Sequence, residues 1–576
     1  MGKQVTKLVR PYRVVDHIVD RLADIGVTHL FGVDGANIED LYDAAHFNTE
    51  ITAVLAKHEF SAATMADGYS RAGTTAGFGV VAATSGGGSL NIVAGLGESL
   101  ASRIPVIALV GQPSTAMDGR GSFQDTSGEN GSLDALRLFS AVSLFCRRVT
   151  DPGDIVTALD EAVTAARTGG PAVLLLPKDI QQSPIEPGRH GAGTDTPARQ
   201  SPDLRPIIEA LSGAGGPVTI IAGEQVARDD ARGELERLRA ALGARIATVP
   251  DAKDVSAPPT LGVTGVMGHP GVAKALADSA LCLLIGTRLS VTARAGLDTA
   301  LHAVPVISVG SAAPYVACMH VHTDDLRVSL SQLSDALPAH LSTRNGCSLD
   351  HSAPDELEPP AFDGPGIRYQ AAVAALHAAL PDGTDIIVDA GNTGAATVHR
   401  LPVRRDGRFV VALGMGGMGY SFGAAIGMAF ARGRRTVVIA GDGAFFMHGM
   451  EVHTAMQYRL PVTFVLFNNN AHAMCVTREQ LFYDDLYSYN RFSPSRLGAG
   501  LASMFPGLPA VDVDVLDELP TALRNALDAD GPSVVSIECS ADEIPPFTAF
   551  LESVQAGNSV PPIDQKESRA DVTTCT

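Results

Sequence analysis

Two short apolar runs flank a helical pattern in the last third of the chain. Residues 436–440 (TVVIA) and 462–467 (VTFVLF) are apolar and largely β-branched, which is typical of strands buried in a parallel sheet. Residues 448–458 predict a helix that stops at Leu460 and Pro461. We expect the inner face of that helix to carry Met450, Val452, Ala455 and Met456.

Polar residues stand where each of these strands ends. Asp442 follows the first strand and Asn469 the second. Strand–helix–strand crossovers are right-handed and bring both strand ends to the carboxyl edge of the sheet, where open α/β sheets bind ligands. A carboxylate, an amide oxygen and a backbone carbonyl suit Mg²⁺ or Ca²⁺. Gly441 and Gly443 permit a diphosphate to approach the backbone. The alternative is a plain turn, since Asp-Gly and Asn-Asn are common loop sequences.

Strands and helices alternate along the whole chain, which predicts an α/β protein with three doubly wound, mainly parallel sheets. A length of 576 residues favours about three to four domains. Polar segments rich in Pro and Gly separate the three blocks. We predict a first domain at 1–182, a linker at 183–203, a central domain at 204–342, a linker at 343–366, a third domain at 367–545 and a mobile tail at 546–576.

Composition excludes several classes of protein. With 45% hydrophobic residues, 18% charged residues and a net charge of −20, the chain is globular and fits neither nucleic acid nor an anionic membrane surface as a partner. No apolar run approaches the roughly 18 residues of a membrane span, and the N-terminal residues lack the apolar core of a signal peptide. Seven scattered cysteines without a CxxC pair indicate reduced thiols in a cytoplasmic protein without a zinc site.

The spacing around Asp442 is more specific than a turn. Gly-Asp-Gly, 24 further residues and then Asn-Asn resembles the signature of thiamine diphosphate enzymes, in particular the group of acetolactate synthases, pyruvate oxidases and 2-oxo acid decarboxylases. The resemblance implies pyrimidine-binding, central and diphosphate-binding domains in that order. It also implies that Asp442, Asn469 and the carbonyl of Ala471 hold Mg²⁺. Around the diphosphate it places Gly441, Asp442, Gly443 and Ala444.

One acid in the first domain is singled out by the same resemblance. Glu59 stands near the start of a predicted helix, where a carboxylate is ordinarily a capping or solvated residue. The sequence HEFSAATMADGYSRA is similar to the family segment that carries the essential glutamate, which shares a proton with the aminopyrimidine ring of the cofactor. Burial would raise the pKa of such a carboxyl group and suit it to proton transfer.

Further segments resemble family loops around the cofactor. In ALGMGGMGYSFG (412–423), Met418 matches the bulky residue that bends the cofactor, beside Gly416; the alternative is a core methionine in a tight turn. Ser421 and Gly423 stand where the family usually has Gly and Pro, which changes the helix entry. Gly391, Asn392 and Thr393 match a family stretch near the diphosphate, and Met474 matches a methionine that contacts the cofactor. Asn91 would face the pyrimidine side of the cofactor; it follows a turn in which Gly87 replaces the family's proline.

The residues that select the reaction are less distinctive. GSFQD (121–125) is similar to the Phe-Gln-Glu segment of acetolactate synthases, so Phe123 and Gln124 would approach the substrate, with Asp125 at the glutamate position. The basic residue that the synthases carry farther along is not evident. His472 is a candidate acid/base beside the metal loop; the alternative is a packed or capping histidine. We expect His448 and His453 to decorate the crossover helix.

The resemblance leaves FAD open. Flavin-containing relatives carry a glycine run after the first central strand and an acidic end on a later strand, whereas this chain has AGEQV (222–226) and ISVGS (307–311). GTRLS (286–290) keeps some resemblance to the family's central domain.

The resemblance predicts decarboxylation of a pyruvate-like 2-oxo acid and carboligation of the product to a second carbonyl, as in acetolactate synthase. A non-ligating decarboxylase or a C–C lyase with the same cofactor is the alternative. A non-catalytic cofactor-binding subunit is disfavoured because Glu59 and Asp442 are both present, and a nicotinamide dehydrogenase because no early strand is followed by G-x-G-x-x-G. In relatives the glutamate and the metal clamp meet across a subunit boundary, which implies a homodimer at least.

Overall fold

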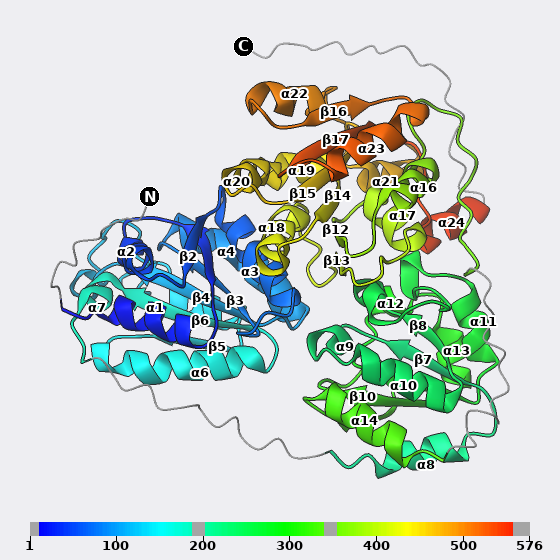
Figure 1. Cartoon of the computed structure of the whole chain (residues 1–576), viewed down its shortest axis with the longest axis horizontal. Coiled ribbons are helices and arrows are strands. Elements are labelled where there is room, and N and C mark those ends of the chain that lie inside the picture. The colour runs from blue at the N-terminus through cyan, green and yellow to red at the C-terminus, as the bar shows by residue number, and fades with distance from the viewer. Residues whose placement is uncertain (1–10, 187–201, 339–353, 557–576) are drawn as a thin grey trace.

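The computed structural model describes residues 11–186, 202–338 and 354–556. Figure 1 shows three α/β units, the first on the left, the second at the lower right and the third above them. Each contains one sheet whose strands pair in parallel. The strand orders are β2-β1-β3-β4-β6-β5, β11-β10-β9-β7-β8 and β13-β12-β14-β15-β17-β16. The predicted fold class is therefore confirmed.

The first unit comprises α1 (Val14–Asp24), β1 (His29–Val33), α2 (Glu39–Phe47), β2 (Thr52–Leu55), α3 (Glu59–Arg71), β3 (Gly79–Ala83), α4 (Gly87–Ala101), β4 (Val106–Gln112), α5 (Ala135–Ser140), β5 (Phe145–Arg148), α6 (Ile155–Arg167), β6 (Pro171–Pro177) and α7 (Lys178–Gln182). The second comprises α8 (Arg205–Gly213), β7 (Val218–Ala222), α9 (Gln225–Arg228), α10 (Arg232–Leu242), β8 (Arg245–Thr248), α11 (Gly271–Ala277), β9 (Leu281–Ile285), α12 (Val291–Arg294), α13 (Asp298–Ala303), β10 (Val306–Gly310), β11 (Met319–His322) and α14 (Leu326–Ala336).

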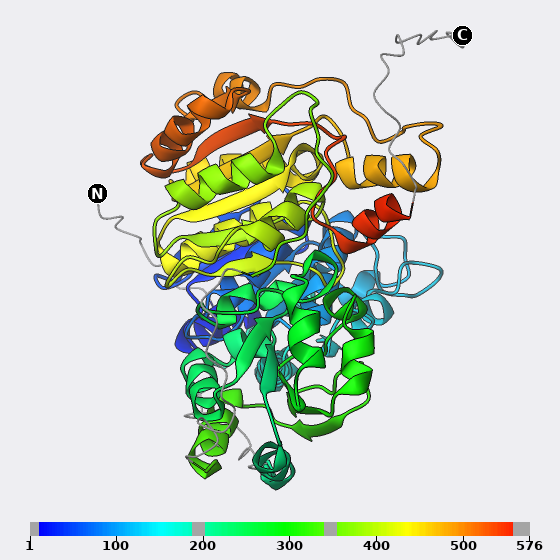
Figure 2. The same cartoon turned by 90° about the vertical axis from the view of Figure 1, so that its right-hand side faces the viewer.

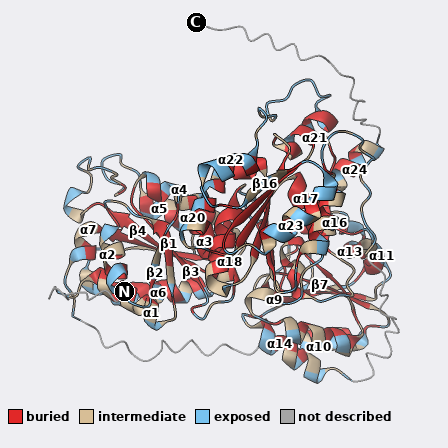
Figure 3. Ribbon diagram, turned by 45° about the horizontal axis from the view of Figure 1, so that its top comes forward, coloured by how far each residue is buried: buried red, intermediate tan, exposed pale blue. Residues whose placement is uncertain are grey.

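The third unit comprises α16 (Tyr369–Ala379), β12 (Asp385–Val388), α17 (Asn392–Arg400), β13 (Phe409–Val411), α18 (Tyr420–Arg432), β14 (Thr436–Gly441), α19 (Asp442–His448), α20 (Val452–Gln457), β15 (Val462–Asn468), α21 (Ala473–Phe482), α22 (Leu497–Met504), β16 (Ala510–Val513), α23 (Leu519–Leu527), β17 (Ser533–Glu538) and α24 (Thr548–Gln555). In all three sheets the central strands are buried beneath helices whose outer faces are exposed, as Figure 3 shows, whereas edge strands such as β5 and β11 are only partly buried.

The predicted crossover lies at the centre of the third sheet. β14 and β15 pair in register from Thr436 with Val462 to Gly441 with Phe467, which confirms both predicted strands. The connection differs from the prediction, because it is not one helix over 448–458. Helix α19 already begins at Asp442, and a 3₁₀ turn at Gly449–Glu451 separates it from α20.

That interruption rotates one predicted inner residue outward. Val452 and Ala455 are buried as expected, and Met456 packs partly buried against the core. Met450 falls within the 3₁₀ turn and is 42% exposed, so its prediction as an inner-face residue is wrong for this chain. The prediction assumes one continuous helical period over residues 448–458, and the sequence gives no sign of the 3₁₀ turn at Gly449–Glu451.

The first and third units share one hydrophobic core, whereas the central unit has a core of its own. Helices α3 and α18 carry the contact: a Cβ added at Gly427 would overlap the carbonyl of Met65, and one at Gly423 would overlap Ser61 and Thr64. The two helices therefore touch at backbone distance. Figure 2 shows the first unit behind the third, with the central unit below both.

The predicted tail begins too early. Residues 548–555 form α24, where Phe550 and Leu551 are buried beside Leu481 of α21. The prediction missed α24 because this amphipathic helix is short and no strand pattern in the sequence marks it. Residues 557–576 and the linker residues 187–201 and 339–353 lie outside the described residues. Within the described part of the chain, no helix combines the length and apolar character needed to cross a membrane.

Candidate functional site

Asp442 and Asn469 lie at the ends of the adjacent strands β14 and β15. Asp442 is fully buried, and its Oδ2 accepts a hydrogen bond of 3.2 Å from the backbone N–H of Ala471. Its Oδ1 has no hydrogen-bond partner in the described structure, and neither has the buried Oδ1 of Asn469. Two buried oxygens without donors are costly in a folded protein, and a divalent cation would satisfy both.

The three consecutive asparagines have different roles. Asn468 Nδ2 donates to the carbonyl of Ser495 at 2.8 Å and to Glu538, while Asn470 Oδ1 accepts the N–H of Ser495 at 2.8 Å. Asn469 instead donates only weakly to the Tyr369 hydroxyl, at 3.4 Å, so its oxygen is left for a ligand. The structure thus distinguishes the predicted ligand from its two neighbours.

The charge of the Asp442 carboxylate fits the same interpretation. Burial raises its pKa to about 7, and the N–H groups of Gly443 and Ala471 only partly oppose that effect. A carboxylate buried without a cation is unstable in its charged form, and a bound Mg²⁺ would restore it. The donor set, a carboxylate, an amide oxygen and the Ala471 carbonyl, consists of oxygens only and therefore suits Mg²⁺.

Gly443 is required by close packing. A Cβ at this position would lie 2.6 Å from His472 Nδ1 and 3.2 Å from Met418 Cε. Met418 is half-buried, on the glycine-rich loop before α18. The predicted wedge methionine, the Gly-Asp-Gly corner and His472 are therefore neighbours, together with the buried Ala444.

The glycine-rich loop is fixed from both sides by acids that sequence reasoning missed. The Asp389 carboxylate, at the end of β12, accepts the N–H groups of Gly419 at 3.0 Å and Ser421 at 2.9 Å. The Glu98 carboxylate, on α4 of the first unit, accepts the N–H of Met415 at 2.6 Å. The position of Asp389 directly after a buried strand was the available signal, whereas Glu98 reads as an ordinary helical residue.

The loop after β12 leads into α17. Gly391 has a φ of +109°, a backbone conformation that is unfavourable for residues with a side chain. It precedes the buried Asn392 and Thr393. Asn392 Nδ2 donates to Thr477 Oγ1 at 3.1 Å, and its buried Oδ1 has no partner. The N–H groups of this helix N-terminus suit a phosphate-bearing ligand, and the unsatisfied Asn392 oxygen would accept a hydrogen bond from a water bound with it.

Glu59 is the first residue of α3, but it does not cap the helix. His58 is the cap, since its Nδ1 accepts the N–H of Phe60 at 3.1 Å. The half-buried Glu59 carboxylate instead accepts a 2.9 Å hydrogen bond from Asn91 Nδ2. A Cβ at Gly88 would lie 3.1 Å from Glu59 Oε1, so the first turn of α4 also approaches this acid.

The residue after Glu59 connects this helix to the third unit. The Phe60 ring stacks on His448 with the ring centroids 4.3 Å apart, and a Cβ on Gly417 would lie 3.4 Å from the Phe60 ring. His448 thus contacts the first unit and does more than decorate its helix. His453 packs near Phe505, with a centroid distance of 5.4 Å.

The other predicted residues lie around these two clusters. Gln124 has a φ of +61° and lies against Gly86 in the turn after β3, whereas Phe123 is 78% exposed. His472 stands at the N-cap position of α21 without a capping hydrogen bond from its side chain, and its ring meets Phe492 edge-on at 4.7 Å; its buried Nδ1 has no partner in the described structure. Met474 is half-buried and packs against the core of the third unit.

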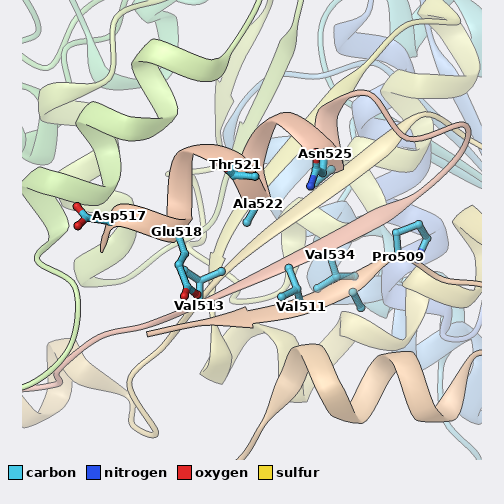
Figure 4. Close-up of a pocket in the computed structure, with 11 residues that line it drawn as sticks. Pro509, Val511, Val513, Asp517, Glu518, Thr521, Ala522, Asn525 and Val534 are labelled. Carbon is cyan, nitrogen blue, oxygen red and sulfur yellow. The ribbon is translucent and has the colours of Figure 1, made fainter. Parts of the chain in front are cut away.

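A groove elsewhere on the third unit does not belong to this constellation. It measures about 550 Å³ and lies between α23 and the edge strand β16, lined by Pro509, Val511, Thr521 and Val534 among others, as Figure 4 shows. None of the predicted site residues lines it.

Three family models match the chain in the order of its three sheets. Residues 12–131 match the N-terminal TPP binding domain of thiamine pyrophosphate enzymes, residues 204–319 the central domain and residues 389–537 the C-terminal TPP binding domain. The chain belongs to the thiamine pyrophosphate enzyme family, as its sequence predicted.

Within that family, it is similar to acetolactate synthases. It is 27% identical to the acetolactate synthase isozyme 2 large subunit of Escherichia coli, covering 92% of this chain and 95% of that protein. It is also 27% identical to the acetolactate synthase of Arthrospira platensis, covering 91% and 94%. The fold matches the crystal structure of benzoylformate decarboxylase from Polynucleobacter necessarius with a TM-score of 0.76, at 19% identity, over 92% of this chain and all of that one.

Proposed function

We propose that this protein is a thiamine diphosphate-dependent enzyme that decarboxylates a pyruvate-like 2-oxo acid and joins the product to a second carbonyl compound. The observation that carries the proposal is the pair of unsatisfied buried oxygens on Asp442 and Asn469, at the carboxyl edge of the C-terminal TPP binding domain. The similarity to acetolactate synthases over nearly the full chain supports the carboligation.

The residues present fit Mg²⁺ and thiamine diphosphate. Asp442, Asn469 and the Ala471 carbonyl would hold the metal, with Gly441, Gly443, Ala444, Gly391, Asn392 and Thr393 around the diphosphate and Gly416, Met418 and Met474 around the rings. Bound there, the cofactor would supply an electron sink for the electron pair left behind when the carboxyl group departs.

The chain's own residues would do the remaining work. Glu59 would hold a proton opposite the cofactor's pyrimidine, and Asn91 would keep that carboxylate in place through its 2.9 Å hydrogen bond. Met418 would restrict the shape of the cofactor, and Glu98 and Asp389 would keep the loop that carries Met418 rigid. Gln124 would contact the substrate, near the exposed Phe123, and His472 with its free Nδ1 is a candidate for a proton transfer beside the metal corner.

The cavity where the three units meet does not carry the charge pattern expected for FAD. It measures about 340 Å³ and is lined by Glu224 and Asp251 together with Arg103 and Arg288. Burial next to Asp251 raises the pKa of Glu224 to about 7. The two arginines of this cavity stand beside two acids, so its lining gives no net positive charge for a diphosphate, and the proposal includes no flavin.

We further propose a homodimer or larger homo-oligomer, in which two copies complete each active site, and a cytoplasmic location. Two exposed apolar residues, Phe446 and Met447, lie on helix α19, which begins at Asp442, and they support a partner subunit at this face. We propose the domain boundaries as predicted, with the third domain extended through α24.

The proposal is tested by supplying pyruvate alone and pyruvate with a second 2-oxo acid to the protein loaded with thiamine diphosphate and Mg²⁺. Acetolactate or a mixed acetohydroxy acid is the expected product. Free acetaldehyde as the main product would instead favour a non-ligating decarboxylase, and no loss of CO₂ from any 2-oxo acid would overturn the proposal.

A further inference from the structure

A hydrogen-bonded group at the carboxyl edge of the first sheet surrounds the side-chain oxygen of Gln124. The buried Asn37 lies after β1, and the buried Thr84 and Ser85 lie directly after β3. Thr84 Oγ1 and Ser85 Oγ are each 3.4 Å from Gln124 Oε1. The first turn of α4 links this group to Glu59, since a Cβ at Gly88 would lie 2.8 Å from the Thr84 methyl and 3.1 Å from Glu59 Oε1.

Asn37 supplies a donor to each of the two hydroxyls. Its backbone N–H donates to Thr84 Oγ1 at 3.2 Å, and its Nδ2 donates to Ser85 Oγ at 2.7 Å. Asn37 is held in turn by Gln181, whose Nε2 donates to the Asn37 carbonyl at 2.8 Å. The backbone at this point cannot shift easily, because the Asn37 carbonyl packs against Gly111 closely enough to overlap a Cβ there.

These contacts determine the direction of the hydroxyl protons. A hydroxyl that accepts from Asn37 keeps its own proton to donate, and Gln124 Oε1 is the acceptor in reach of both. Nδ2 of Asn37 adds a third, longer contact to the same oxygen at 3.5 Å. Three donors converge on one end of the Gln124 amide group, which assigns the atom at that end as its oxygen.

We propose that Asn37 is a positioning residue that orients the Gln124 amide so that its Nε2 donors face the substrate. The inference rests on the proposed function and specifies it: Gln124 acts as a donor, and the substrate group that it binds is an oxygen acceptor, the carboxylate or carbonyl of a 2-oxo acid. The left-handed backbone of Gln124, with φ +61°, is the kind of strained conformation that persists where function requires it.

The test is the variant Asn37→Asp, in which the new side chain has nearly the same shape but no donor. Ser85 would then donate its proton to the introduced carboxylate, Gln124 would lose that donor, and its amide would no longer be held in one orientation. We expect the KM for the 2-oxo acid to rise about tenfold with a smaller change in kcat, the size of one hydrogen bond. The Kd of oxamate, measured by calorimetry on the protein loaded with thiamine diphosphate and Mg²⁺, should rise by a similar factor.

Two further variants separate orientation from general damage. Gln124→Met removes the donors without adding a charge, and Asn37→Asp should add little in that background, because both changes remove the same interaction. Asn48→Asp, at a half-buried asparagine elsewhere in the first domain, is the matched control and should leave KM and the oxamate Kd unchanged.

The outcomes distinguish this inference from the proposed function. If the wild-type protein neither converts pyruvate nor binds oxamate, the proposed function fails and the inference falls with it. If the wild type does either and Asn37→Asp matches it within twofold, or if the Asn37 and Gln124 effects add independently, the positioning role alone is overturned.

Discussion

Asn91 Nδ2 donates a 2.9 Å hydrogen bond to Glu59 Oε2, which joins the start of α4 to the start of α3. This bond leaves the other carboxylate oxygen of Glu59 available, beside Gly88 in the first turn of α4. A proton-transferring acid must be held in place without being neutralised by a cation, and an amide donor achieves this.

Replacing Glu59 by glutamine should preserve the fold and reduce turnover by roughly 10²–10⁴-fold, because the amide can still accept from Asn91 but cannot exchange a proton. Steady-state rates and melting temperatures of both proteins check this. Glu50→Gln, at an exposed acid of the same domain, is the control and should behave as wild type. Wild-type turnover in the Glu59 variant, with the cofactor bound, would refute its role.

Replacing Asp442 by asparagine should separate apo stability from metal binding. The apoprotein should be as stable as wild type or more so, because a buried carboxylate without a cation is removed. Mg²⁺ and thiamine diphosphate at about 100 times their Kd should stabilise the wild type by about 2.7 kcal/mol and the variant far less. Thermal melts with and without both ligands provide the measurement. Equal ligand-induced shifts in the two proteins would exclude Asp442 as a metal ligand.

Met418→Ala should retain thiamine diphosphate but lose at least about tenfold in turnover, since the side chain that restricts the cofactor's shape is missing. Met418→Leu keeps the bulk and should retain most activity. Cofactor titration and turnover of both variants test the role; an alanine variant as active as the leucine variant would contradict it.

Acid should weaken the contact between the central and third domains. His399 Nδ1 donates to the Met267 carbonyl at 3.0 Å, and its Nε2 accepts the N–H of Leu357 at 2.9 Å, so the buried ring must be neutral. Burial lowers the pKa of His399 to about 4 and that of His269, stacked on it at 4.4 Å, to about 3.

The unfolded chain, with histidine pKa values near 6.5, therefore binds more protons than the folded one as the pH falls below that value. The stability from these rings is fully present above about pH 6.5 and declines from there towards pH 4. His399→Gln keeps a donor and an acceptor, so its melting temperature should fall less steeply over this range. Parallel slopes for variant and wild type would show that His399 does not titrate as argued.

Much of the fold was predictable because strands that are buried in a parallel sheet have continuous apolar sequences. β14 and β15 were placed to within a residue, and their ends located Asp442 and Asn469. The break at Gly449–Glu451 was not predictable, since local periodicity cannot show that a helix restarts in a new direction. Met450 was misplaced for that reason.

The site was predictable where it follows strand ends and obscure where it depends on contacts between residues far apart in the chain. Asn37, Glu98 and Asp389 act through hydrogen bonds to residues 30 to 317 positions away. No spacing in the sequence encodes such bonds. The separation of Asn469 from its two neighbours likewise required the positions of Ser495 and Tyr369.

The glycines that bring α3 against α18 have a consequence for how this chain can be divided. Because the Met65 carbonyl lies against Gly427 with no side chain between them, the first and third domains bury apolar surface against each other. Expressing either of these two domains alone would expose the helix face that the other covers and should yield aggregates.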